Sequence, residues 1–166
     1  MKSRSSELTA ILVGCGDISN VWLESISRTR GLDLVGLVDL DTSVASSQAA
    51  RHGFADITID SHLKRVLKKV NPDIVFDCTV PSAHATVTID SLRHGCHVLG
   101  EKPLSDSLRS ARRMIDAAAK ADKFYAVMQN RRFDPNIRRL RRFVESQRIG
   151  ALTTLNSDFY IGAHMG

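Results

Sequence analysis

The stretch that decides the fold runs from Ala10 to Asp41 and reads AILVGCGDISNVWLESISRTRGLDLVGLVDLD. It begins with an apolar run, breaks at a glycine turn, resumes at helical spacing, and ends in a second apolar run before Asp39. Strand, glycine turn, helix, strand and acid form the pattern of a dinucleotide-binding βαβ unit. The alternative, a glycine turn that binds nothing, leaves the position of the acid unexplained. The sequence therefore predicts a nucleotide site at this turn.

Each part of this pattern has a physical role in holding a nucleotide. Gly14 permits the tight turn out of the strand, and Gly16 lets the backbone come close to a pyrophosphate. The following helix directs N–H groups and the positive end of its dipole at that anion. Ser19 replaces the third glycine of the pattern and is small enough for close packing of helix on strand. Asp39 is placed to accept hydrogen bonds from ribose hydroxyls.

The composition is that of an ordinary globular domain. The 166 residues are 43% hydrophobic and 25% charged, which suffices for one domain with a core and leaves few residues for a second. No apolar run is long enough to span a bilayer, and the first residues do not resemble a secretory signal. The three cysteines lack metal-site spacing, so we expect reduced, mostly buried thiols in a cytoplasmic protein with no metal and no membrane partner.

Much of the net charge of +5 lies in one arginine-rich segment, from Arg131 to Arg142. A nucleic-acid-binding patch is one interpretation of this segment. No aromatic stacking platform or recognised binding motif accompanies the arginines, which favours a solvated helix face. We therefore expect no nucleic-acid partner.

Apolar runs and helical patterns alternate along the chain. Alternation of this kind predicts a doubly wound parallel sheet with helices on both faces and ligands at the carboxyl ends of the strands. The glycine turn, the segment after Cys78 and Glu101-Lys102-Pro103 all fall at that edge. Thr42 and Ser105 are expected to cap two of the helices. The expected strands lie at 10–13, 32–38, 56–59, 73–78, 96–99 and 124–128.

The character of the sequence changes after Met128. A basic helix is expected from about Pro135 to Gln147, followed by a strand from Leu152 to Ile161 that includes two aromatic residues. A lone terminal strand does not complete a sheet. We therefore expect a nucleotide-binding domain over residues 1–129 and the truncated start of an α+β C-terminal domain over residues 130–166. The unpaired edges of its strand predict self-association.

Several segments together suggest a family. They are the glycine turn at 14–19, Thr79 followed by His84, Glu101-Lys102-Pro103, and the run Asn130 to Pro135 with Ile149-Gly150. Over essentially the whole chain this ordered set resembles the Gfo/Idh/MocA (glucose–fructose oxidoreductase / inositol dehydrogenase) family. The resemblance implies an NAD(P)-dependent oxidoreductase acting on a sugar, inositol or related polyol. It also implies a Rossmann domain followed by a C-terminal sheet that makes a homo-oligomer interface.

The resemblance further assigns roles to individual residues. Lys102 matches the lysine that reaches toward nicotinamide and substrate, which makes it the candidate catalytic residue. The Lys102-Pro103 bond could be cis, as is common in the family. Val80-Pro81 departs from the commoner Pro-Asn order in the loop near the nicotinamide. The implied cofactor-binding set comprises Gly14, Gly16, Asp17, Ile18, Ser19, Asp39, Thr79, Val80, His84, Glu101 and Lys102.

Two functions remain open at this point. One is hydride transfer between NAD and a carbon bearing a hydroxyl group, with Lys102 orienting or deprotonating that hydroxyl. The other is a truncated or regulatory module that holds NAD and catalyses nothing. In either case NAD is expected over NADP, because Asp39 would repel a 2′-phosphate and is followed by Leu40 and Asp41 rather than by an arginine.

Overall fold

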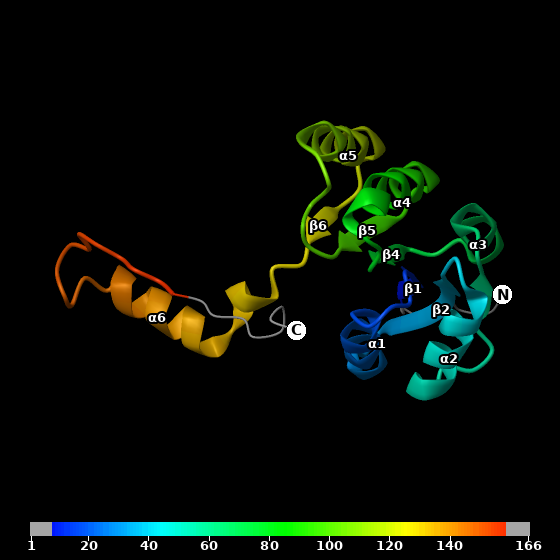
Figure 1. Ribbon diagram of the computed structural model, residues 1–166, viewed down its shortest axis with the longest axis horizontal. Helices are drawn as coiled ribbons and strands as arrows, with labels where there is room; N and C mark the ends of the chain where they lie inside the picture. Colours follow the sequence, from blue (N-terminus) through cyan, green and yellow to red (C-terminus); the bar gives the residue numbers. More distant parts are fainter. Residues whose placement is uncertain (1–7, 159–166) are drawn as a thin grey trace. The chain divides into compact units, whose positions relative to one another are not determined.

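The computed structural model describes residues 8–158 of the chain. They contain a six-stranded, all-parallel sheet in the order β3-β2-β1-β4-β5-β6 (Figure 1). This order is that of a dinucleotide-binding doubly wound fold, so the predicted fold class is confirmed. The strands are β1 (Leu8–Val13), β2 (Leu32–Val38), β3 (Thr58–Asp60), β4 (Ile74–Asp77), β5 (His97–Gly100) and β6 (Tyr125–Val127). The helices between them are α1 (Ser19–Arg28), α2 (Thr42–His52), α3 (Leu63–Val70), α4 (Pro81–His94) and α5 (Leu108–Ala121).

The two faces of the sheet carry separate apolar cores. Leu12 of β1 packs in one core with Trp22 and Leu23 of α1 and with residues of α2. Ile11 packs in the other with residues of α3 and α4. Successive side chains of a strand point to opposite faces, so an unbroken apolar run such as Ala10–Val13 serves both cores. Figure 1 shows α1 and α2 on one side of the sheet and α3, α4 and α5 on the other.

The carboxyl ends of the strands meet at one edge of the sheet. Val13 at the end of β1 is paired with Val38 of β2 and with Asp77 of β4, and Asp77 is paired with Gly100 of β5. The chain turns from β1 toward β2 and β3 on one side, and resumes with β4 to β6 on the other. The crevice above β1 and β4 is therefore the switch point where ligands bind in such sheets.

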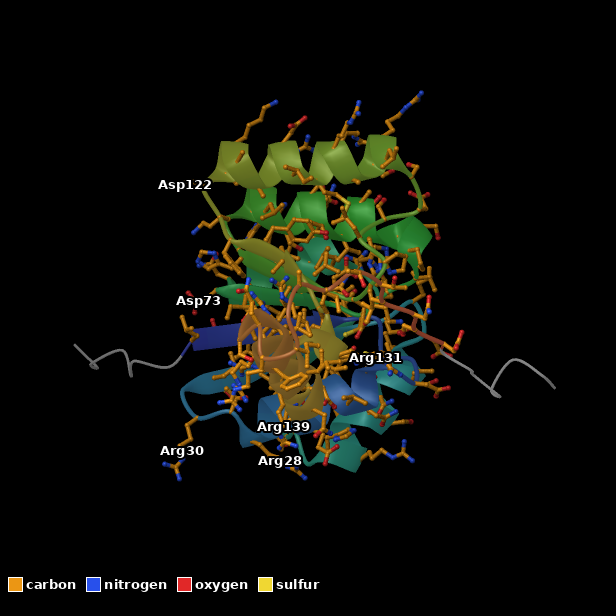
Figure 2. The ribbon with its side chains drawn as sticks, turned by 90° about the vertical axis from the view of Figure 1, so that its left-hand side faces the viewer. Arg28, Arg30, Asp73, Asp122, Arg131 and Arg139 are labelled. Carbon is orange, nitrogen blue, oxygen red and sulfur yellow. The ribbon has the colours of Figure 1, made fainter. Side chains whose placement is uncertain are left out.

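The opposite edge of the sheet is closed by structural hydrogen bonds. Figure 2 shows Arg30, Asp73 and Asp122, which precede β2, β4 and β6, along this edge. The Asp73 carboxylate accepts hydrogen bonds from both the backbone N–H and the hydroxyl of Thr9, each at 2.8 Å. These bonds join the beginning of β1 to the beginning of β4.

Two predicted helix caps are wrong by one or two positions. Asp41, not Thr42, caps α2, and its side chain accepts from the N–H of Ser43. Ser107, not Ser105, caps α5 and accepts from the N–H of Ser110. In both cases the capping residue must keep an extended backbone just outside the helix, and Thr42 already has helical conformation.

The chain divides into two compact units, Met1–Met128 and Gln129–Gly166. The second unit contains a short 3₁₀ helix, η1 (Asn130–Phe133), and α6 (Pro135–Glu145), whose N-cap Asp134 accepts from two backbone N–H groups. The predicted strand is not formed over 152–158, and the described part of the second unit contains no strand that could pair with it. Its last residues, 159–161, lie outside the described part. None of the helices between residues 8 and 158 has the length and apolar character that crossing a membrane requires.

Candidate cofactor site

The turn between β1 and α1 needs glycine at its first position. Gly14 has φ +88°, and a Cβ there would lie 2.8 Å from the backbone C and O of Cys78 and from the backbone N of Thr79. The turn therefore packs directly against the loop after β4, and only a residue without a side chain permits that approach. The predicted role of Gly14 in a tight turn agrees with this geometry.

Gly16 differs from Gly14 because it faces open space. A Cβ on Gly16 would meet no atom within 4 Å, so the fold itself does not require glycine there. Space beside a backbone at the beginning of a helix fits a group that approaches the chain closely, such as a pyrophosphate. Among the described residues, no side chain caps the N-terminus of α1, which leaves this helix end available to an anion.

Ser19 occupies the position of the missing third glycine. It is fully buried, and its hydroxyl donates a 2.6 Å hydrogen bond to the carbonyl oxygen of Gly16. The serine thus fits the close contact between helix and strand and also fastens the turn. Asp17 and Ile18 lie between these two residues and are exposed, with Ile18 44% exposed.

Asp39 is held in place by two backbone N–H groups. Its Oδ2 accepts from the N–H of Cys15 at 2.6 Å, and its Oδ1 accepts from the N–H of Asp41 at 2.9 Å. Each carboxylate oxygen can accept more than one hydrogen bond, so both remain able to accept from ribose hydroxyls. The end of β2 and the glycine turn are therefore joined at the position where the sequence predicts the adenosine ribose.

Gln48 is a site residue that the sequence analysis missed. It lies on α2, is only 8% exposed, and donates from Nε2 to the carbonyl oxygen of Cys15 at 3.2 Å. The Cys15 residue is thus fixed at its N–H by Asp39 and at its carbonyl by Gln48. Its position three residues after the buried Ala45, on the buried face of the helix, was the available signal.

A cavity of about 420 Å³ lies at this edge of the sheet. Its wall is largely apolar, and among the lining residues that the structure describes Asp39 is the only acidic or basic one. A concave, mostly apolar site with few polar groups is typical of cofactor sites. It brings together the glycine turn, the end of β2 and the loop after β4, and is lined by Val13, Gly14, Gly16, Val38, Asp39, Leu40, Ser61, Leu63, Cys78, Thr79, Val80, Ala83 and Val87.

A buried cluster of polar side chains lies next to the loop after β4. His84 is 2% exposed, and its Nδ1 lies 3.1 Å from Oδ1 of Asp77, which is fully buried. Its imidazole is thus turned toward Asp77 and does not line the cavity with Thr79 and Val80. Asp77 was not singled out from the sequence, because an acid at the end of an apolar strand also fits an ordinary strand end.

Glu101 joins the loop after β5 to helix α1. Its Oε1 accepts from the indole N–H of Trp22 at 2.8 Å, and its Oε2 accepts from the N–H of Lys102 at 3.0 Å. Trp22 is itself buried and lies against the ring of Phe76, with ring centroids 5.5 Å apart. The Lys102-Pro103 peptide bond is cis, and the side chain of Lys102 is exposed.

The three cysteines are free and buried. Burial, assisted by Asp39, raises the pKa of the Cys15 thiol to about 12, and burial likewise raises the pKa of Cys96 to about 11. Burial also raises the pKa of Cys78. These thiols stay protonated at neutral pH and act as small apolar groups. Within residues 8–158 no group of three or more His, Cys, Asp or Glu is placed to hold a metal ion.

Comparison with known proteins agrees with this geometry. Residues 8–129 match the GFO_IDH_MocA model, which describes an oxidoreductase family with an NAD-binding Rossmann fold. The chain belongs to the Gfo/Idh/MocA family. This membership confirms the predicted family and the prediction that the cofactor is NAD. An NAD-binding family is consistent with the cavity that the glycine turn and Asp39 form.

Two of the relatives that match this chain are named dehydrogenases. The chain is 32% identical over 149 residues to D-glucoside 3-dehydrogenase of Escherichia coli, covering 89% of this chain and 42% of the relative. It is 29% identical over 139 residues to myo-inositol 2-dehydrogenase of Thermotoga maritima, covering 84% of this chain and 41% of that protein. The chain thus spans less than half the length of these relatives.

A solved structure shows the same fold in a complex with cofactor. The WlbA dehydrogenase of Chromobacterium violaceum, in complex with NADH and UDP-GlcNAcA, superposes with a TM-score of 0.79 at 27% identity. The match covers 89% of this chain and 42% of that one. The matched portion of these proteins therefore corresponds to the sheet and helices described above.

Proposed function

We propose that this chain is the cofactor-binding part of an oxidoreductase that transfers hydride between NAD and the hydroxyl-bearing carbon of a sugar, inositol or related polyol. The observation that carries the proposal is the cavity at the switch point, which unites Gly14, Gly16 and Asp39 with Thr79 and Val80. The names of the two dehydrogenases above, which act on a glucoside and on myo-inositol, support the substrate class.

The chemistry of the cavity residues suits NAD. The glycine turn and the N-terminus of α1 receive the pyrophosphate, and Asp39 accepts from the adenosine ribose. Thr79 and Val80 form the wall toward the nicotinamide half. When bound, NAD supplies the hydride acceptor, while the protein binds it, orients it and excludes water.

NAD is the proposed cofactor rather than NADP. A phosphate on the ribose 2′-oxygen would lie next to the Asp39 carboxylate, and like charges at that distance repel each other. Leu40, the residue that follows, is 94% exposed and offers no cation to such a phosphate.

Lys102 is the proposed catalytic residue. It follows β5 at the same edge of the sheet, and its exposed ammonium is free to reach a substrate hydroxyl.

The second candidate function is an NAD-binding module without turnover. It is favoured by the exposure of Lys102, because a general base must be held within reach of the proton that it takes, and solvent surrounds this side chain.

The remaining proposals concern the setting of the domain. We expect residues 130–166 to begin a C-terminal domain for substrate binding and oligomerisation, and the protein to act as a homo-oligomer. The three free, buried cysteines support a cytoplasmic location, where thiols remain reduced.

Cofactor binding measured on this chain and turnover measured on the complete protein test the proposal. Trp22 is the single tryptophan, so transfer of its fluorescence energy to NADH reports binding directly. We expect saturable NADH binding, weaker NADPH binding, and NADH formation from NAD with a polyol when the complete protein is assayed. Lys102→Ala in the complete protein should lower kcat far more than it lowers the affinity for NAD. Absence of NADH binding would refute the proposal, and binding without turnover in the complete protein would favour the module.

A further inference from the structure

We propose that Asp77 is a positioning residue that holds the loop after β4 in the shape that the cofactor requires, with His84 orienting its carboxylate. The inference rests on the proposed function, because this loop is a wall of the same cavity. Asp77 is the last residue of β4 and is fully buried. Its neighbours in the sheet are Val13 and Gly100, so a polar residue at this level is an exception.

One oxygen of Asp77 fixes Thr79 twice. Oδ1 accepts from the Thr79 hydroxyl at 2.6 Å and from the Thr79 backbone N–H at 3.1 Å. A carboxylate bonded to the backbone two residues later forms an Asx-turn, which sets the direction in which the chain leaves the strand. The next residue, Val80, is 63% exposed and lines the cavity.

His84 holds the same oxygen from helix α4. Its Nδ1 lies 3.1 Å from Oδ1 of Asp77 and 3.3 Å from the Thr79 hydroxyl. A proton on Nδ1 lets the ring donate to the carboxylate, which leaves Nε2 as the bare acceptor. Nε2 is buried without a partner among the described residues, and a bare nitrogen there costs less than a buried N–H without an acceptor. The pair thereby selects one tautomer and one ring orientation.

The other oxygen of Asp77 faces away from the loop. Oδ2 accepts from the hydroxyl of Thr88 at 3.3 Å. Tyr125 of β6 also lies near this group, and its hydroxyl stays neutral because burial raises its pKa to about 12. Thr88 therefore belongs to the same buried cluster but is not one of the residues that line the cavity, which makes it a matched control.

A buried carboxylate is costly, and an apolar residue at the end of β4 would serve the sheet at least as well. Three of the four hydrogen-bond contacts described here engage Oδ1 and tie it to Thr79 and His84 of the loop and helix that wall the cavity. The wall itself, Val80 and Ala83, is apolar and meets a ligand by shape alone. The position of this wall therefore depends on the hydrogen bonds that Asp77 makes, whereas the sheet itself does not require an acid at this position.

The test compares Asp77→Leu with Asp77→Asn in the 166-residue chain, with NADH as the probe. Leucine removes the acceptor, whereas the amide oxygen of asparagine still accepts from Thr79. We expect NADH affinity to fall about tenfold in Asp77→Leu, and by less than about threefold in Asp77→Asn and in the control Thr88→Val. Thr79→Val should weaken binding in the wild-type background and add little in the Asp77→Leu background.

Two binding results would overturn the inference. One is wild-type NADH affinity in a folded Asp77→Leu chain, and the other is an additive effect of Thr79→Val in that background. A second readout separates this inference from the proposed function. Exchange of the Thr79 amide hydrogen should be at least about tenfold faster in Asp77→Leu than in wild type, because its acceptor is lost. A wild-type chain that fails to bind NADH refutes the proposed function, and equal Thr79 exchange rates refute the role of Asp77.

Discussion

The two glycines of the turn should respond to the same substitution in opposite ways. Gly16→Ala places a Cβ where no atom lies within 4 Å, and no left-handed φ is needed there. The free energy of unfolding should therefore stay the same or rise by up to about 1 kcal/mol, because alanine restricts the unfolded chain. If the pyrophosphate occupies this space, the methyl group overlaps it, and an extra methyl in a filled site costs about 1–3 kcal/mol. The affinity for NADH should then fall between about 5-fold and 150-fold.

Gly14→Ala is the matched comparison. Its Cβ would lie 2.8 Å from three backbone atoms, and its φ of +88° is unfavourable for alanine. The conformational cost of about 1–2 kcal/mol and an overlap cost of about 1–3 kcal/mol together predict a loss of about 2–5 kcal/mol in the free energy of unfolding. Urea unfolding followed by Trp22 fluorescence measures this loss, and energy transfer from Trp22 measures NADH binding.

The reasoning depends on the contrast between the two variants. A Gly16→Ala chain that binds NADH within about twofold of wild type would show that no pyrophosphate approaches this backbone. A Gly16→Ala chain that loses as much stability as Gly14→Ala would show that the turn is packed on both sides.

Three further predictions concern charge, the far edge of the sheet and pH. Asp39→Asn should weaken NADH binding and narrow the preference for NADH over NADPH, and an unchanged ratio of the two dissociation constants would contradict the role of Asp39. Thr9→Val removes the 2.8 Å bond to Asp73 and should lower the free energy of unfolding by about 1 kcal/mol without changing NADH affinity. The folded chain raises the pKa of Cys15 from 9.0 to about 12 and of Cys96 from 9.0 to about 11, whereas the unfolded chain releases these protons from about pH 9 upward. Urea unfolding should therefore show full stability from the thiols below pH 9 and a progressive loss as the pH rises toward 11, and a flat profile in that range would contradict their burial.

Local sequence patterns predict the sheet, the glycine turn and the position of Asp39. An apolar run such as Ala10–Val13 predicts a strand covered on both faces, and glycine after it predicts a turn, because both properties depend on residues adjacent in sequence. Asp39 was predictable for the same reason, since it follows its strand directly. Over residues 152–158 the expected strand is not formed, because a strand depends on a neighbouring strand, which apolar alternation does not supply.

The contacts that hold the site depend instead on topology. Trp22 meets Glu101 across 79 positions, and Gln48 meets Cys15 across 33. The sequence could place Glu101 at the correct edge, but the partner of its carboxylate is set by how α1 packs on the sheet. His84 illustrates the same limit, because the family pattern places it near the cofactor and the structure turns its ring toward the buried Asp77.

The loops that line the cofactor cavity are fixed by hydrogen bonds before a ligand binds, whereas the candidate catalytic residue Lys102 is not. Asp39 and Gln48 hold the glycine turn at Cys15, and Asp77 holds the opposite wall at Thr79, all within the protein itself. A loop that is already in its bound shape loses little conformational entropy when it binds, so the loops around the cavity should bind NAD with a small entropic cost of ordering. Lys102 is exposed, and it gains a fixed orientation only from a substrate and from the groups that enclose it. Cofactor affinity and turnover should therefore respond to different residues, the first to the bonds beneath the loops and the second to Lys102.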